Sequence, residues 1–347
     1  MAQERDEEHD DDAASEKGKA SAEVALLEKA KNARSALAAA VATRVVGQED
    51  VIDLMLVSLL ARGHALLVGV PGLAKTLLVS TLAEALDLEF GRVQFTPDLL
   101  PADITGTDVL HEEEDESGRA RRRVRFQPGP IFHNLILADE INRTPPKTQA
   151  ALLQAMQERK VTAFGSTHDL PDPFLVFATR NPIEQEGTYP LPEAQLDRFL
   201  LEIHVDYPNE SEEREIARRT TSGETSDVPK VLSGDDVRAL QKLVPRMPVT
   251  DEAIALAVAL TRATRAGGGD GVEKYIRFGA GPRGSQALVL AAKARAALRG
   301  EGAADVEDVE ALYVPVLRHR LVLSYRAESD GVHEEDVLSG LREKTKG

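Results

Sequence analysis

The chain has 347 residues, of which 42 are Lys or Arg and 58 are Asp or Glu, giving a formal net charge of -16 at neutral pH. This excess of acids argues against a protein that binds nucleic acid through its overall charge, and the length predicts two domains with a sizeable core. The sequence contains no Cys, which excludes disulfides, thiolate metal ligands and a cysteine nucleophile, and fits a reducing compartment.

The first 21 residues form an acidic segment. Residues 1–20 contain eight acids and three bases, a local net charge of -5, and almost no apolar side chains. This composition predicts a disordered tail over residues 1–21. The segment lacks the basic start and apolar run of a secretory signal, and no stretch reaches the length of a membrane span. We therefore expect a cytoplasmic protein.

Residues 22–208 alternate between helical and strand patterns. Apolar spacing predicts a helix from residue 22 and a second helix after Glu49. Short apolar runs then predict five strands, at residues 65–68, 93–95, 135–138, 174–178 and 200–203. Strands that alternate with helices indicate a three-layer α/β domain with a parallel sheet.

A second domain follows a charged, Ser/Thr-rich connection. Residues 209–232 read as a linker or connecting helix, after which the strand signals stop. Helical spacing recurs at residues 235–244, 251–265, 284–298, 305–318 and 334–344, with a Gly run at 267–269 breaking the set. Residues 233–347 are therefore expected to form a small helical bundle.

A glycine-containing loop links the first predicted strand to a helix. It reads Gly69-Val70-Pro71-Gly72-Leu73-Ala74-Lys75-Thr76, the context that a phosphate-binding loop requires. In that role Lys75 reaches the β- and γ-phosphates, and the Thr76 hydroxyl is a ligand of Mg²⁺. Ala74 stands where the usual motif has a second Gly. An ordinary Gly/Pro turn is the alternative, but turn chemistry does not require Lys-Thr at the helix start.

Polar residues follow three other predicted strands. Asp139 and Glu140 suit Mg²⁺ and the orientation of an attacking water, although an isolated Asp-Glu pair is more often a solvated strand end. Asn181 could bind that water or the γ-phosphate, and an Asn-Pro turn is an equal alternative. Arg198 lies between apolar residues near the next strand, where a surface ion pair would be the usual role.

Together these motifs resemble an AAA+ ATPase, and more narrowly the MoxR family. The resemblance covers residues 45–323 and includes Val46-Gly-Gln-Glu49, the phosphate loop, residues 93–106, 126–132, 138–143 and 191–199, and Val316-Leu-Arg-His-Arg-Leu321. It implies a three-layer αβα AAA+ P-loop domain followed by a small all-α lid domain. It also implies that residues 69–76, Leu77, Gln48 and Arg283 bind ATP.

The resemblance also assigns roles to Asn181, Arg198 and Arg283. Asn181 becomes a sensor of the γ-phosphate, and Arg198 an arginine finger that reaches the ATP of a neighbouring subunit. Arg283 matches a second sensor at the start of a lid helix, where the residues alone indicate only a Gly/Pro loop and a helix start. Arg143 and Arg180 are competing cations for the finger role.

Residues 108–126 carry opposite charges on two arms. Acids fill residues 112–116, Ser117-Gly118 reads as a turn, and basic residues fill much of 119–125, which predicts a hairpin. Cross-strand ion pairing is the simpler and slightly favoured account. The resemblance implies instead a hairpin facing the pore of a ring, where the arginines would grip an acidic client. A second hairpin is expected at residues 161–170.

We therefore expect a Mg²⁺-dependent, ring-forming ATPase, usually a hexamer in this clade, that activates or assembles client proteins. The family often acts with a partner that contains a von Willebrand factor A domain. One alternative is a nucleotide-gated scaffold with little hydrolysis. Another is a motor subunit resembling magnesium chelatase or acting on DNA, and the net charge and lack of interleaved aromatic residues disfavour DNA.

Overall fold

The computed structural model describes residues 3–114, 120–163, 165–183, 187–221, 226–265 and 271–346. Its centre is a five-stranded sheet in the order β2-β5-β8-β1-β9, with every neighbouring pair parallel. The strands are β1 (His64–Val68), β2 (Phe90–Gln94), β5 (Leu135–Asp139), β8 (Leu175–Arg180) and β9 (Phe199–His204). All five predicted strands are present, and the predicted α/β fold is confirmed.

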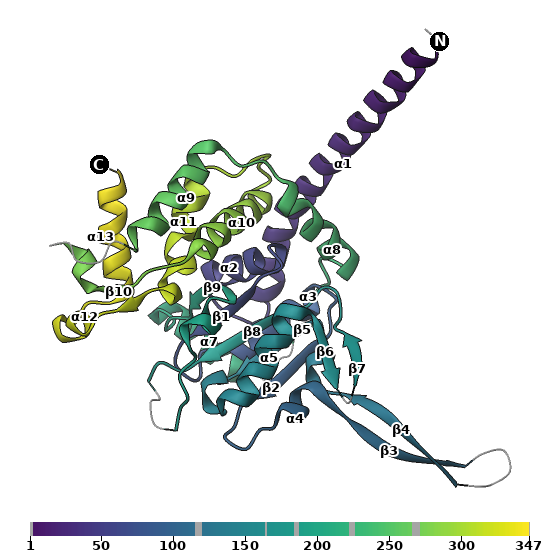
Figure 1. Cartoon of the computed structure of the whole chain (residues 1–347), viewed down its shortest axis with the longest axis vertical. Coiled ribbons are helices and arrows are strands. Elements are labelled where there is room, and N and C mark those ends of the chain that lie inside the picture. Colours follow the sequence, from purple (N-terminus) through teal and green to yellow (C-terminus); the bar gives the residue numbers. More distant parts are fainter. Residues whose placement is uncertain are drawn as a thin grey trace.

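Helices cover both faces of this sheet. Alternate residues of β1 point to opposite sides: Ala65 and Leu67 pack with one apolar cluster, and Leu66 and Val68 with another. The first cluster includes α1 (Gln3–Ala42), α2 (Glu49–Leu60) and α3 (Lys75–Ala85). The second includes α4 (Pro101–Thr105) and α5 (Pro146–Glu158). The domain is therefore a three-layer αβα arrangement (Figure 1).

The C-terminal part is a helical lid. After α7 (Glu210–Thr221) it contains α8 (Gly234–Leu243), α9 (Asp251–Ala263), α10 (Pro282–Arg299), α11 (Val306–Leu317), α12 (Tyr325–Asp330) and α13 (Glu334–Lys346). The short strands β10 (Ile276–Phe278) and β11 (Val322–Leu323) pair within it. Leu288 and Leu312 belong to the same apolar cluster as α1 and α2, so the lid packs directly on the core. The predicted Gly break at 267–269 lies outside the described residues.

The acidic N-terminal segment is helical in the structure, and the disorder of residues 1–21 stays a prediction. From residue 3 onward it forms the first part of α1, which extends away from the rest of the molecule in Figure 1. The second half of α1 is anchored by buried residues such as Ala30, Leu37 and Val41.

Both predicted hairpins are present. The strands β3 (Gly106–Glu114) and β4 (Ala120–Pro128) project from the core, and β6 (Lys160–Ala163) pairs with β7 (Ser166–Asp169). In the first hairpin the backbone register sets Glu112 opposite Arg122. The predicted turn at Ser117-Gly118 lies outside the described residues.

Candidate functional site

The loop between β1 and α3 is shaped by unusual backbone conformations. Gly72 and Ala74 have φ angles of 90° and 54°, in the left-handed region. Gly69 must be glycine for a different reason, because a Cβ there would lie 2.6 Å from the carbonyl oxygen of Val205. The left-handed conformation costs an alanine roughly 1–2 kcal/mol. The loop therefore holds strain at Ala74, directly before the N-terminus of α3.

Lys75 lies across this loop. Its Nζ donates hydrogen bonds to the carbonyl oxygens of Gly69 and Val70, both at 2.7 Å. Burial lowers the pKa of Lys75, and the nearby carboxylates of Asp139 and Glu140 act in the opposite direction. The ammonium group and the N-terminus of α3 thus form a positive site at the end of β1.

One hydroxyl group contacts both the Asp139 carboxylate and the backbone of Glu140. Thr179 Oγ1, at the end of the neighbouring β8, donates to Asp139 Oδ1 at 2.7 Å and accepts from the backbone N–H of Glu140 at 2.8 Å. The other oxygen of Asp139 accepts from Arg92 Nη2 at 2.7 Å. The carboxylate of Asp139 is therefore held on both of its oxygens.

The Glu140 carboxylate is held from two sides. Gln94 Nε2 donates to Oε2 of Glu140 at 3.0 Å, and Arg143 Nε lies 3.1 Å from the same oxygen. Glu140 also has a positive φ of 58°, which turns the chain sharply after β5. Its position thus depends on neighbours from β2 and from the turn that follows β5.

One cavity of about 450 Å³ brings these groups together. Because β5, β8 and β1 are adjacent parallel strands, their carboxyl ends meet at one edge of the sheet. Asn181 follows β8, is buried, and accepts a hydrogen bond from the Ile183 backbone through Oδ1 at 3.1 Å. The lining residues are Pro71, Gly72, Leu73, Ala74, Lys75, Thr76, Leu77, Arg92, Gln94, Asp139, Glu140, Thr179 and Asn181.

Arg198 and Arg283 lie elsewhere. Neither is among the described residues that line this cavity; both line a second pocket of about 340 Å³, together with Asp197 and Arg320. Arg198 lies between α6 (Glu193–Leu196) and β9, and Arg283 is in the first turn of α10. Arg283 Nη1 is 3.5 Å from Asp197 Oδ2. The two arginines that resemble a finger and a second sensor therefore lie together, apart from the phosphate loop of their own chain.

The remaining candidates are engaged within the core. Gln48 has a φ of 64° and donates from Nε2 to the carbonyl oxygen of Asp206 at 3.1 Å. Arg180 Nη2 lies 3.6 Å from Glu202 Oε2 on β9. Arg143 and Arg180 were the two alternatives for the finger role. Arg143 contacts Glu140, and Arg180 lines a pocket together with lid residues such as Glu335.

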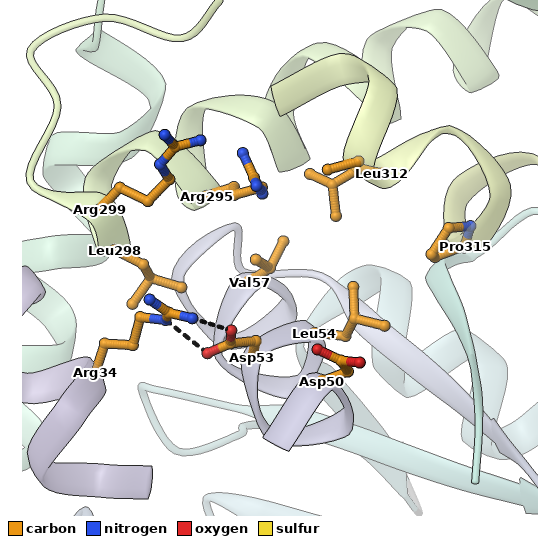
Figure 2. A pocket seen from close by; sticks show the side chains of 11 residues that line it. Arg34, Asp50, Asp53, Leu54, Val57, Arg295, Leu298, Arg299, Leu312 and Pro315 are labelled. Atoms are coloured by element: carbon orange, nitrogen blue, oxygen red, sulfur yellow. Dashed lines mark hydrogen bonds and ion pairs between the residues drawn. The ribbon is translucent and has the colours of Figure 1, made fainter. Parts of the chain in front are cut away.

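A third cavity, of about 340 Å³, lies between the core helices α1 and α2 and the lid helices α10 and α11 (Figure 2). Arg34 on α1 donates from Nε to Asp53 Oδ1 at 2.7 Å, and Arg295 donates to Asp308 at 2.6 Å. Arg299 donates to Glu307 at 2.6 Å. Carboxylates thus already engage each of the three arginines that line this cavity, which does not favour it as an anion site.

Comparison with known proteins agrees with this geometry. The profile of the "ATPase family associated with various cellular activities (AAA)" matches residues 64–201, and the profile of the "AAA lid domain" matches residues 270–341. Chaperone MoxR1 of Mycobacterium tuberculosis is 45% identical over 299 residues, covering 85% of this chain and 77% of that protein. Protein MoxR of Paracoccus denitrificans is 37% identical and covers 81% of this chain and 86% of its own length.

The chain belongs to the MoxR family of AAA+ ATPases. A crystal structure of a protein from Cytophaga hutchinsonii supports the fold, with a TM-score of 0.81 at 39% identity over 91% of this chain and 96% of that one. The AAA+ family implies nucleotide binding, for which the cavity at the phosphate loop has the required groups.

Sequence reasoning missed three residues of this MoxR-family site: Arg92, Gln94 and Thr179. A signal existed, because Arg92 and Gln94 occupy alternate positions near the end of β2 and so point to one side of the sheet. Thr179 is a polar residue at the end of an otherwise apolar run. These patterns become informative only when the strand order sets β2 and β8 on either side of β5.

The donor set also fits a magnesium ion. Thr76 and Asp139 supply oxygen ligands to the same cavity, and Mg²⁺ in nucleotide sites takes one or two protein ligands together with phosphates and water. In the part of the chain that the structure describes, no group of three or more His, Asp or Glu side chains could hold a metal by itself. In the same residues, no helix has the length and apolarity that a bilayer span requires.

Proposed function

We propose that this MoxR-family protein hydrolyses ATP with Mg²⁺ and uses the energy to remodel client proteins. The observation that carries the proposal is the single cavity that Lys75 and Thr76 share with Asp139 and Glu140. An ordinary Gly/Pro turn or a solvated strand end would not bring these four groups into one cavity. Their chemistry matches the parts that phosphoryl transfer requires.

Each group has a role in that reaction. The N–H groups at the start of α3 and the Lys75 ammonium bind the phosphates, and Glu140 orients the attacking water. Thr76 and Asp139 would hold Mg²⁺, which when bound neutralises phosphate charge. Asn181 is the proposed sensor of the γ-phosphate. Gln94 and Thr179 position the two carboxylates.

We propose that Arg198 acts on the ATP of a neighbouring subunit in a ring, usually a hexamer in this clade. Arg283 shares the second pocket with Arg198, which supports action of both arginines across the same interface. The expectation that Arg283 binds ATP would then apply to the ATP of the neighbouring subunit. The number of subunits, six, is proposed from the family resemblance.

The client role rests on the relatives. One of them is named a chaperone, and we propose the same for this chain, in cooperation with a protein that contains a von Willebrand factor A domain. The projecting β3–β4 hairpin is the proposed contact for the client. It presents Leu110 and Val124, which are exposed and directly opposite each other.

Phosphate release by purified variants tests the enzymatic proposal. Lys75→Ala and Glu140→Gln should each abolish turnover, and Glu140→Gln should still bind ATP because the phosphate loop is intact. Lys147→Ala on α5 and Glu252→Gln on α9 make the same chemical changes at exposed positions and should leave turnover unchanged. Normal turnover in both active-site variants would contradict hydrolysis at this site. ATP binding with negligible turnover in the unmodified protein would favour the scaffold alternative.

A further inference from the structure

The lid contributes one buried arginine to the boundary with the core. Arg320 ends a single 3-10 turn, η5 (Arg318–Arg320), that follows α11, and its side chain is only 4% exposed. A buried guanidinium is costly unless its donors are satisfied. The targets of those donors therefore show what the residue holds in place.

Most of these donors reach the segment that contains Arg198. Arg320 Nε donates to Asp197 Oδ1 at 2.9 Å, and Nη2 donates to the Phe199 carbonyl oxygen at 2.8 Å. Nη1 donates to the Leu200 carbonyl oxygen at 3.2 Å and also to that of Val316. The residues on both sides of Arg198 are thus bound to one side chain of the lid. A planar guanidinium suits this task because its donors have fixed directions.

Asp197 also connects two arginines of the lid that line the second pocket. Its Oδ1 accepts from Arg320, and its Oδ2 lies 3.5 Å from Arg283. Asp197 is the carboxylate among the described residues that line this pocket, and the cations that line it are Arg62, Arg198, Arg283 and Arg320. The carboxylate of the residue directly before Arg198 therefore contacts two arginines of the lid.

We propose that Arg320 is a positioning residue for Arg198. It binds residues 197–200 to the lid, so that a displacement of the lid also displaces Arg198. This inference rests on the proposed function, in which Arg198 serves the ATP of the neighbouring subunit. It gives the lid of one subunit control over hydrolysis in the next subunit. Arg320 itself touches no substrate.

Two adjacent arginines provide a matched test in the full-length protein. Arg320→Lys keeps the charge but loses the fork that binds both sides of Arg198. Arg318→Lys makes the same change in a side chain that is 10% exposed and donates to Glu335 Oε1 at 2.6 Å, a contact within the lid. Hydrolysis should fall about tenfold to a hundredfold in Arg320→Lys, since small misplacements of catalytic groups have effects of this size, and stay within about twofold in Arg318→Lys.

Mixing experiments separate positioning from a folding defect. Arg320→Lys subunits should bind a fluorescent ATP analogue normally and recover turnover when mixed with Lys75→Ala subunits, which hydrolyse nothing themselves but supply an intact finger. Arg198→Ala subunits mixed in the same way serve as the reference. Asp197→Asn, which leaves the arginine in place but removes its charged partner, should behave as Arg320→Lys does.

The outcomes distinguish the two proposals. Near-normal turnover in both Arg320→Lys and Asp197→Asn would overturn the positioning role. Loss of turnover without recovery on mixing would also overturn it if Arg198→Ala recovers, because the defect would then lie within the subunit's own fold or site. If Arg198→Ala itself fails to recover in rings shown to form, the finger across the interface fails, and the positioning role fails with it.

Discussion

Replacing Thr179 by valine tests whether one hydroxyl group fixes the Asp139 carboxylate and the Glu140 backbone. Valine has nearly the same shape, but it can neither donate to Asp139 Oδ1 nor accept from the Glu140 N–H. Hydrogen bonds to charged groups contribute about 1.5–3 kcal/mol, and an unsatisfied buried N–H costs about 1–3 kcal/mol. Asp139 keeps Arg92, and both carboxylates line a cavity that water can enter, so the loss should be near the lower end. We expect the free energy of unfolding to fall by about 2–3 kcal/mol.

Urea unfolding followed by circular dichroism measures this loss, and Thr179→Ser is the matched control. Serine keeps the hydroxyl and removes a methyl group, so its cost should be about 1 kcal/mol. Turnover should also fall about tenfold in Thr179→Val, because the Asp139 carboxylate and the Glu140 backbone lose a contact that holds them in position. Equal unfolding free energies for the valine and serine variants would refute the reasoning, since the hydroxyl would then contribute nothing.

Three further predictions concern the same domain. Gln94→Ala should lower kcat about tenfold with little change in KM, because it removes a hydrogen bond of about 1.5 kcal/mol to the Glu140 carboxylate; a rise in KM with unchanged kcat in steady-state kinetics would contradict this. Ala74→Gly should raise the free energy of unfolding by about 0.5–1 kcal/mol, because glycine adopts a φ of 54° without strain; a lower urea midpoint would contradict this. Burial lowers the pKa of His64 from 6.5 to about 4, so the unfolded chain binds a proton between these pH values that the folded chain does not. The contribution of His64 to stability should therefore decrease as pH falls from 6.5 to 4, by up to about 3 kcal/mol, and His64→Gln should show a correspondingly weaker dependence in urea unfolding across that range.

The sheet and the residues around the phosphate loop were predictable because local patterns determine them. Buried parallel strands are continuous apolar runs, and polar residues directly after such runs meet at one edge of the sheet. Lys75, Asp139 and Asn181 could therefore be expected in one place before their distances were known. The positions of Arg92 and Gln94 could not, because they depend on which strand pairs with β5.

The two outlying arginines show a different limit of sequence reasoning. Arg198 and Arg283 are 85 positions apart in the numbering, and only the packing of the lid on the core brings them into the same pocket. The motifs assigned each arginine a role at ATP, but they did not indicate that the two side chains share one pocket. Arg320 occurs in a recognisable motif whose spacing gives no indication that it binds the segment around Arg198. Tertiary packing alone provides that information.

The separation of Arg198 from the cavity of its own chain has a kinetic consequence. Under the proposed arrangement, no single subunit contains a complete set of catalytic groups, and each one depends on contact with a second copy. Turnover per subunit would then rise with protein concentration until the rings are fully assembled. The amount of protein present, and not only the supply of ATP, would decide when hydrolysis begins.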